Sequence, residues 1–247
     1  MSVPAISPRI EWLMGFPERA LASIAESLSL AQQIRHPLSL QLALIVGSVL
    51  HLYRGELELA LHLDAVEALA TEQRLGFVRE PRFVRGAALI AQGAPAEGLV
   101  VLREGLATPV GQGTWRSLGL ALLAHGLVLR REFSNALVAI AEGLERAKAT
   151  GERQWEAELH RLKGLALLGH NEIEGSQATF EEALRVARRQ QAKSYELRAA
   201  TSLARLWGGQ GRRAEARDLL APVYGSFTEG FDTVDLKEAK ALLDELA

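Results

Sequence analysis

The sequence predicts an all-α protein built as a right-handed α-solenoid of about five to six helical hairpins. Two observations predict this class. Leu (43) and Ala (38) far outnumber Val (14) and Ile (8), so strong helix formers dominate the 247 residues. Small residues also recur every 38 to 40 positions, which is the length of one helical hairpin.

Turn-like breaks, each followed by a small residue that opens a new apolar run, mark this repeat. The clearest breaks lie in the segments GFPERAL, GELELAL, GAPAEGL, REFSNAL and GRRAEAR. The small anchor residues, with Ser176 completing the series, are Ala20, Ala60, Gly98, Ala136, Ser176 and Ala216. Their successive separations are 40, 38, 38, 40 and 40 residues, which indicates a true period.

A second set of small residues stands twelve positions before the last five anchors. These residues are Ser48, Gly86, Ala124, Gly164 and Ala204. Four positions after the anchors stand large apolar residues, with Asp64 as the exception: Ile24, Leu102, Ile140, Phe180 and Leu220. Small residues on two segments divided by a turn let antiparallel helices approach closely, and the large residue fills the gap between them. Each repeat is therefore predicted to be a helical hairpin.

The helices can be placed in order from these signals. A lone second helix is predicted over residues 17–34, because Pro17 suits a first helical turn. Helix pairs are predicted at 38–53 and 56–74, 79–92 and 95–107, 115–130 and 133–149, 153–168 and 174–191, and 194–208 and 212–227. Pro37, Pro81 and Pro109 fall between hairpins, and Pro222 is predicted to kink or end the last second helix.

The two ends of the predicted array of hairpins differ from its middle. A final helix is predicted over 235–246, where Asp235 and Glu238 have capping-box spacing, and it would cover the last hairpin's apolar face. We thus expect a single repeat domain over 1–247, with an incomplete first repeat (1–34), five hairpins (38–227) and a C-terminal capping helix (235–246). Residues 10–14 resemble the stub of a first helix, so we expect a fragment or a truncated relative of a longer protein.

Hairpins of this pattern resemble the tetratricopeptide repeat. The best match is the last repeat but one, where Gly164, Phe180 and Ala183 echo the Gly, Phe and Ala positions of that family. The repeats depart from the family in length, with 38 to 40 residues against its usual ~34. The resemblance implies an interaction module that binds protein or peptide.

A second resemblance covers most of the chain. The segments TEQRLGF, TGERQWEAELHRLKG, RRQQAKSYELRAATSLARLW and YGSFTEGFDTVDLKEAKALLDEL are similar to the C-terminal repeat region of large bacterial signalling proteins. In those proteins an adenylate/guanylate cyclase or another output domain precedes an AAA-type ATPase and then the helical array. The resemblance implies a regulatory or partner-binding tail, because no GxxxxGK[ST] phosphate loop occurs here.

Composition argues against several classes of protein. The chain has no Cys, which argues against disulfides and thiolate zinc sites and suits a reducing cytoplasm. Its net charge of -2 argues against a nucleic-acid surface. The N-terminus lacks the pattern of a secretory signal, and the most apolar stretch, 38–53, is too short to span a membrane. We therefore expect a cytoplasmic protein without nucleic-acid or membrane partners.

Catalysis, metal binding and cofactor binding are not expected. The six His residues never show HExxH spacing. The carboxylate pairs Glu156/Glu158 and Glu181/Glu182 lie in charged helical stretches, where a solvated face is the ordinary explanation. We predict no catalytic residues, no cofactor and no metal.

The face of the first helices that lines a groove is the candidate binding site. If each first helix presents the positions six and three before, and one, four and five after, its small anchor, these positions line the groove. The candidates chosen from these positions are Tyr53, Phe83, His125, Glu158, Arg161, Arg198, Thr201 and Arg205. The late groove would be cationic and suited to carboxylates. Three alternatives stay open. Glu158 and Glu196 neutralise these arginines, His125 is a packing residue, or the early apolar lining is packed by a missing N-terminal part of a longer parent chain.

The predicted function is a protein- or peptide-binding module that regulates or scaffolds a bacterial signalling system. Its partner would be an output domain in cis or a protein in trans, and a homodimer through the incomplete N-terminal hairpin is a further hypothesis. One alternative is a small-effector sensor that controls an attached ATPase, cyclase or transcriptional output domain. Another is an enzyme, for which the sequence offers no convergent acid, base or nucleophile.

Overall fold

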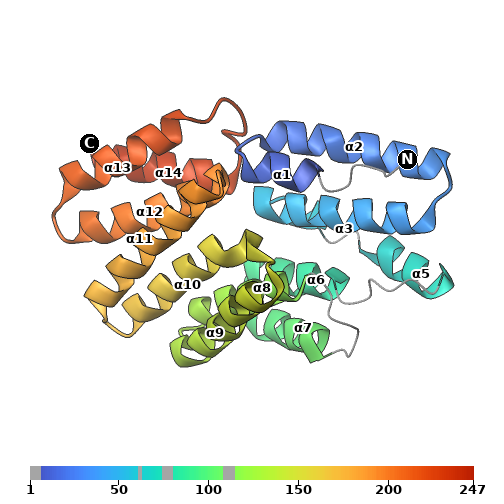
Figure 1. The fold of residues 1–247 in the computed structure, drawn as a ribbon, viewed down its shortest axis with the longest axis horizontal. Coiled ribbons are helices and arrows are strands. Elements are labelled where there is room, and N and C mark those ends of the chain that lie inside the picture. Colours follow the sequence, from blue (N-terminus) through green and yellow to red (C-terminus); the bar gives the residue numbers. More distant parts are fainter. Residues whose placement is uncertain (1–6, 61–62, 74–79, 108–114) are drawn as a thin grey trace. The chain divides into compact units, whose positions relative to one another are not determined.

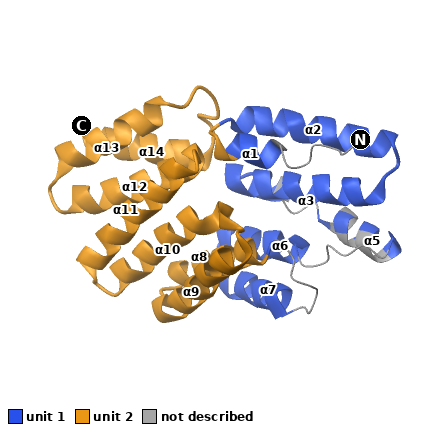
Figure 2. Ribbon diagram, in the orientation of Figure 1, with its two compact units in different colours: residues 1–12, 16–115 blue, residues 13–15, 116–247 orange. Residues whose placement is uncertain are grey.

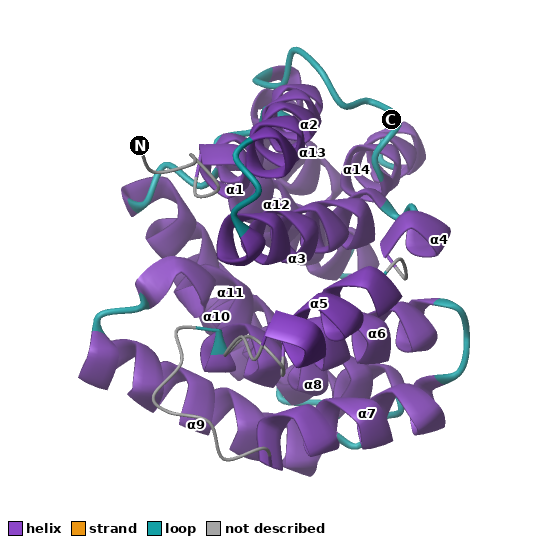
Figure 3. Ribbon diagram, turned by 90° about the vertical axis from the view of Figure 1, so that its right-hand side faces the viewer, coloured by secondary structure: helices purple, strands orange, loops and turns teal. Residues whose placement is uncertain are grey.

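A computed structural model describes residues 7–60, 63–73, 80–107 and 115–247 of the chain. Within those ranges the ordered elements are helices joined by turns, and no strand is found (Figures 1 and 3). This confirms the predicted all-α helical-repeat class. The chain divides into two compact units, residues 1–12 with 16–115 and residues 13–15 with 116–247 (Figure 2). The single repeat domain over 1–247 stays a prediction.

Unit 1 contains the early repeats. Its helices are α1 (Ser7–Leu13), α2 (Pro17–Gln33), α3 (Pro37–Arg54), α4 (Leu57–Ala60), α5 (Asp64–Gln73), α6 (Glu80–Ala91) and α7 (Pro95–Ala107). Helix α2 packs against α3, and α6 packs against α7 as an antiparallel hairpin. Proline stands at the first position of α2, α3 and α7, where its missing N–H costs no helical hydrogen bond.

Unit 2 contains the later repeats. Its helices are α8 (Arg116–Leu129), α9 (Phe133–Thr150), α10 (Glu156–Gly169), α11 (Ile173–Arg189), α12 (Lys193–Gly209), α13 (Arg213–Gly225) and α14 (Val234–Glu245), with a 3₁₀ turn, η1, at Arg153–Trp155. The first helices α8, α10 and α12 and the final helix α14 pack side by side in that order. The second helices α9, α11 and α13 each pack onto first helices. We call the side formed by α8, α10, α12 and α14 the inner face of unit 2.

The small anchors are the points where paired helices meet. The Ser176 hydroxyl in α11 donates to the Gly164 carbonyl of α10 at 2.9 Å, and both residues are buried. The Phe180 ring lies directly against Gly164, and a Cβ at Gly86 would lie 2.7 Å from the Gly98 carbonyl oxygen. The twelve-residue spacing and the large residue four positions after the anchor therefore have the predicted packing roles.

The hairpin turns share one backbone geometry. Gly15, Gly55, Gly93, Arg131, Asn171 and Gly211 all have positive φ, and they repeat with the period of the anchors. In each turn the next residue's N–H bonds back to the carbonyl five residues earlier, as in Glu172 to Leu167 at 3.0 Å. This closes the first helix with a Schellman motif. Glycine favours that conformation, whereas Arg131 and Asn171 adopt it with a side chain.

Some predicted elements differ from the structure. The helix predicted over 56–74 is divided into α4 and α5, and residues 61, 62 and 74 lie outside the described part. Helix α13 continues through Pro222 to Gly225 and does not end at the proline. Asp235 is not the N-cap of α14, because the helix begins at Val234 and the Asp235 carboxylate binds Arg198. Residue 79 and Pro109 also lie outside the described residues.

The hydrogen bond of Ser176 gives a first testable result. We expect Ser176→Ala to lower the free energy of unfolding by about 1 kcal/mol, because the buried hydroxyl bond to Gly164 is lost. Ser134→Ala, on the exposed side of α9, should change it much less. Urea unfolding followed by circular dichroism measures both. Equal losses would show that the Ser176 bond does not stabilise the α10–α11 hairpin.

Candidate functional site

Charged side chains from consecutive helices meet on the inner face of unit 2. Glu158 and Arg161 stand three residues apart on α10, so they emerge on one side of that helix. Arg198 comes from α12 and Asp235 from the first turn of α14. We call these residues, together with His125 of α8, the charged row.

Opposite charges alternate along the charged row. Arg161 donates from Nε and Nη2 to the two Glu158 carboxylate oxygens, both at 2.8 Å. The Arg198 Nη1 atom lies 3.5 Å from Glu158 Oε1, and its Nε donates to Asp235 Oδ2 at 2.8 Å. Bidentate and charge-assisted bonds of this kind fix the planes of the guanidinium groups. The row therefore holds two cations and two anions in a set geometry across α10, α12 and α14.

Glu158 is the electrostatic centre of the row. Burial by itself would raise the pKa of its carboxyl, but the charge and hydrogen bonds of Arg161, followed by the charge of Arg198, lower that pKa to about 2. The same contacts with Glu158 raise the pKa of Arg161 against the effect of its own burial. Both groups are therefore charged throughout the physiological pH range.

His125 stands next to these charges on α8. Its side chain is exposed to solvent, yet it is crowded by the surrounding helices of the inner face. That crowding is the first cause that lowers the pKa of His125, to about 4, and the positive charges of Arg161 and Arg198 act in the same direction. Glu158 acts in the opposite direction and is outweighed. His125 is thus neutral near pH 7.

This shift predicts how stability depends on pH. In the unfolded chain a His binds a proton near pH ~6.5, whereas folded His125 resists protonation until about pH 4. Lowering the pH through this window therefore favours the unfolded state, so stability should fall. His125→Asn should reduce the loss between about pH 7 and about pH 5 in urea unfolding. An unchanged pH slope in the variant would contradict the assignment.

The structure brings together five of the eight predicted site residues in unit 2. His125, Glu158, Arg161 and Arg198 are within electrostatic reach of one another. Arg205 lies two turns after Arg198 on α12, with 60% of its side chain exposed. Its nearest carboxylate, that of Glu238, is 4.0 Å away.

Three predicted site residues need correction. Phe83 is fully buried, and its ring packs against Gly105 inside the α6–α7 hairpin. Thr201 is buried and donates its hydroxyl to the Leu197 carbonyl at 2.8 Å. The position three before the anchor therefore faces the core, and only a side chain as long as Arg161 reaches the surface from it. Tyr53 is also largely buried, and its ring stacks on Trp12 in unit 1 at a centroid distance of 4.2 Å.

The expectation of a cationic late groove is wrong in this form. Glu158 neutralises Arg161, as one alternative proposed, and Asp235 pairs with Arg198. Glu196, the other proposed counter-ion, pairs instead with Arg188 at 2.7 Å. Sequence reasoning missed Asp235, which it assigned to a helix cap. Only the packing of α14 against α12 makes it a partner of Arg198.

The described residues lack two further features. They hold no group of three or more His, Asp or Glu side chains placed to bind a metal ion. Among the helices of the described ranges, none combines the length and the apolar character needed to cross a membrane. The Gly-rich segment at 207–213 forms the Schellman turn between α12 and α13, as predicted for a helix terminator. Residues 111–114 of the other Gly-rich segment are outside the described part.

The fold and this row define an all-α helical-repeat protein whose first helices present a set of fixed charges. No model of a known protein family matches the chain, and a search of curated proteins gave no match. Among solved structures the chain is similar to one titled "TPR2AB-domain:pHSP90-complex of yeast Sti1". The sequences are 13% identical, the match covers 97% of this chain and 95% of that one, and the TM-score is 0.40.

Proposed function

We propose that this protein is a protein- or peptide-binding repeat module, which serves as the regulatory or scaffolding portion of a cytoplasmic bacterial signalling protein. The observation that carries the proposal is the charged row on the inner face of unit 2. Its partner is an output domain in cis or a separate protein in trans. The bacterial setting rests on the sequence resemblance described above.

The energetics of the row support a role in recognition. Placing ion pairs where they are largely withdrawn from water often stabilises a fold less than apolar side chains of similar size would. Such pairs do fix the positions of donors and acceptors, which a partner needs for specific recognition. Glu158 and Arg161 have side chains only 11% and 13% exposed, so their geometry is held before any partner arrives.

The carboxylate pairs do not favour catalysis. Glu158 is ionised at all moderate pH values and is engaged by two arginines, so it is a poor proton donor. Glu156 lies 3.6 Å from Arg189, and Glu182 pairs with Arg185. Glu156 and Glu182 are thus engaged by arginines, and Glu181 accepts a hydrogen bond from Gln177 at 2.9 Å. We therefore propose a binding role without turnover.

Site-specific photo-crosslinking tests the proposal. A benzophenone amino acid placed at His125 would report contacts of the inner face, and one at Val138, which is 70% exposed on α9, would report the second helices. We expect the His125 position to form a crosslink with one identified protein in the source cells and the Val138 position to form none. Mass spectrometry then identifies the crosslinked peptide.

Two results would contradict the proposed function. One is the absence of any crosslink from His125 in cells that contain the protein at its natural level. The other is an equal yield of the same crosslink from Val138, which would mean that the inner face is not the binding surface. A crosslinked peptide from the same polypeptide would support a partner in cis.

A further inference from the structure

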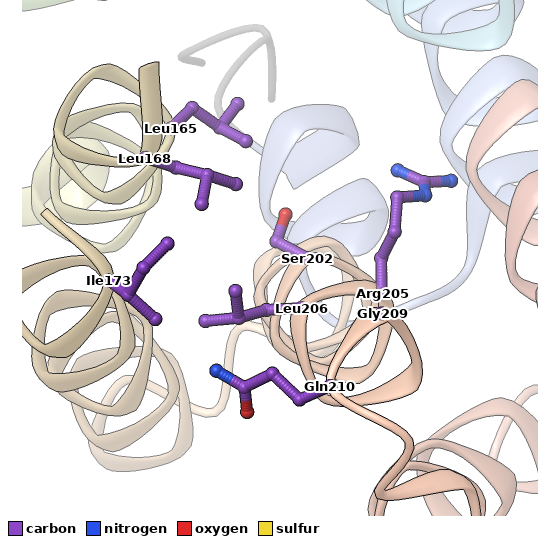
Figure 4. A pocket seen from close by; sticks show the side chains of 8 residues that line it. All are labelled: Leu165, Leu168, Ile173, Ser202, Arg205, Leu206, Gly209 and Gln210. Carbon is purple, nitrogen blue, oxygen red and sulfur yellow. The ribbon is translucent and has the colours of Figure 1, made fainter. Parts of the chain in front are cut away.

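A cavity of about 500 Å³ opens between α10 and α12 of unit 2, beside the charged row. Its lining residues are Leu165, Leu168, Ile173, Ser202, Arg205, Leu206, Gly209 and Gln210. Figure 4 shows Leu165, Leu168 and Ile173 on one wall, facing Leu206 across the space. Leu165, Leu168 and Ile173 are only partly covered by the core, whereas Leu206 is buried in it. The three partly covered side chains therefore offer an apolar surface to a ligand.

Arg205 supplies the charge at this cavity. It is the one charged residue of the lining, and Figure 4 shows its guanidinium directed away from the leucine wall. Arg205 and Glu238, 4.0 Å apart, are both more than half exposed, which makes their ion pair weak. An anion next to the cavity can therefore form an ion pair with Arg205 without breaking a buried ion pair.

Ser202 connects the cavity to the charged row. Its hydroxyl donates to the Arg198 carbonyl at 2.9 Å and lies 3.5 Å from Arg161 Nη1. The cavity and the row therefore adjoin each other at Ser202. A ligand that touches both must reach from the cavity to the row, which favours a peptide chain over a compact small molecule.

Gly209 leaves room at one edge of the cavity. It is the last residue of α12, and a Cβ built on it would meet no atom within 4 Å. A larger side chain there would enter the open space without pressing on the fold. Gly225 ends α13 in the same way, also with nothing within 4 Å, and does not line the cavity.

We infer that the cavity between α10 and α12 receives an apolar side chain of a bound peptide, and that Arg205 pairs with an acidic residue beside it. This inference rests on the proposed peptide-binding function. The ligand class is a peptide with Leu, Ile, Met or Phe next to Asp or Glu. The apolar wall favours the apolar residue of the peptide, and Arg205, the one charged residue of the lining, favours the acidic residue.

The probe is a set of peptides, which are selected from a random phage-displayed library for binding to the full chain. They are synthesised with a fluorescent label, and their affinities are measured by anisotropy. We expect enrichment of an apolar residue next to an acidic one. Gly209→Leu should weaken binding at least tenfold, because it fills the space that the apolar side chain would bury, whereas Gly225→Leu should leave binding unchanged.

A charge variant tests the second contact. Arg205→Glu should weaken binding severalfold and reduce its dependence on salt. Arg217→Glu, an equal charge change on the exposed side of α13, is the control and should have little effect. The helical signal by circular dichroism must match that of the wild type in all four variants. A loss of affinity then reports a change at the cavity and not unfolding.

Three outcomes would overturn the inference. If selected peptides bind equally well to Gly209→Leu but lose affinity in Arg198→Ala, the inner face binds peptides outside the cavity, and the proposed function survives alone. If no selected peptide binds the chain, both proposals fail. If the chain self-associates and only Gly209→Leu disperses it in analytical ultracentrifugation, the cavity holds a second copy of this chain.

Discussion

Replacing Gly86 with alanine should destabilise unit 1 by about 3 kcal/mol, at the upper end of the usual cost of overpacking. The added Cβ would lie 2.7 Å from the Gly98 carbonyl oxygen and 2.7 Å from Leu102 Cγ. A backbone atom cannot move aside as a flexible side chain can, so α6 and α7 would have to separate. The gain of about 1 kcal/mol in helix propensity is too small to offset this.

Gly47→Ala is the matched control in the same unit. Its new Cβ would lie 3.4 Å from Ile24 Cγ2, which is close to ordinary contact, so stability should stay the same or rise slightly. Urea unfolding gives the loss of stability, and amide hydrogen exchange in α6 and α7 locates it. A Gly86→Ala variant as stable as Gly47→Ala would contradict the close approach of these helices.

Replacing Glu158 with glutamine should lower the free energy of unfolding by about 2–4 kcal/mol near pH 7, because it removes the shared anion of two cations. Arg161 and Arg198 would then stand together on the inner face without their common partner. Glutamine keeps the size of the side chain, so the loss reports charge more than packing. Urea unfolding of the wild type and the variant gives the difference.

The pH dependence of that difference checks its cause. Glu158 has a folded pKa of about 2, below its usual value of 4.5, so its charge stabilises the fold above about pH 4.5. This stabilisation is lost as the pH falls toward 2, and the difference between wild type and variant should shrink over that window. Glu215→Gln removes an exposed partner of Arg212 and should change stability little. A Glu158→Gln effect no larger than that control would contradict a stabilising charged row.

The sequence predicted the hairpins because their packing is local. Anchors twelve residues apart face each other across one turn, so their spacing is visible in the chain itself, as Ser176 and Gly164 illustrate. The turn geometry was less visible. Arg131 and Asn171 have the left-handed backbone conformation that a glycine at their positions would have indicated from the sequence. Only the recurring period marks them as equivalents of Gly93.

The candidate site was predicted in part. His125, Glu158, Arg161, Arg198 and Arg205 follow from the inward register of the first helices. Phe83 and Thr201 share the register of Arg161, but the Phe83 ring packs inside its hairpin and the Thr201 hydroxyl bonds to its own helix, so both are buried. Register predicts which side of a helix a residue faces, and the length of the side chain decides whether it reaches the surface.

The sequence by itself determined the all-α class, the period of 38 to 40 residues and most helix bounds of this protein, because these depend on propensity, turn residues and contacts within one hairpin. Only the tertiary structure decided the charge pairing, since Arg198 meets Glu158 and Asp235 at sequence distances of 40 and 37 residues. It also decided the cavity beside Gly209, whose lining brings together residues of α10, α11 and α12. Such contacts depend on how hairpins stack, and no local pattern of residues encodes that arrangement.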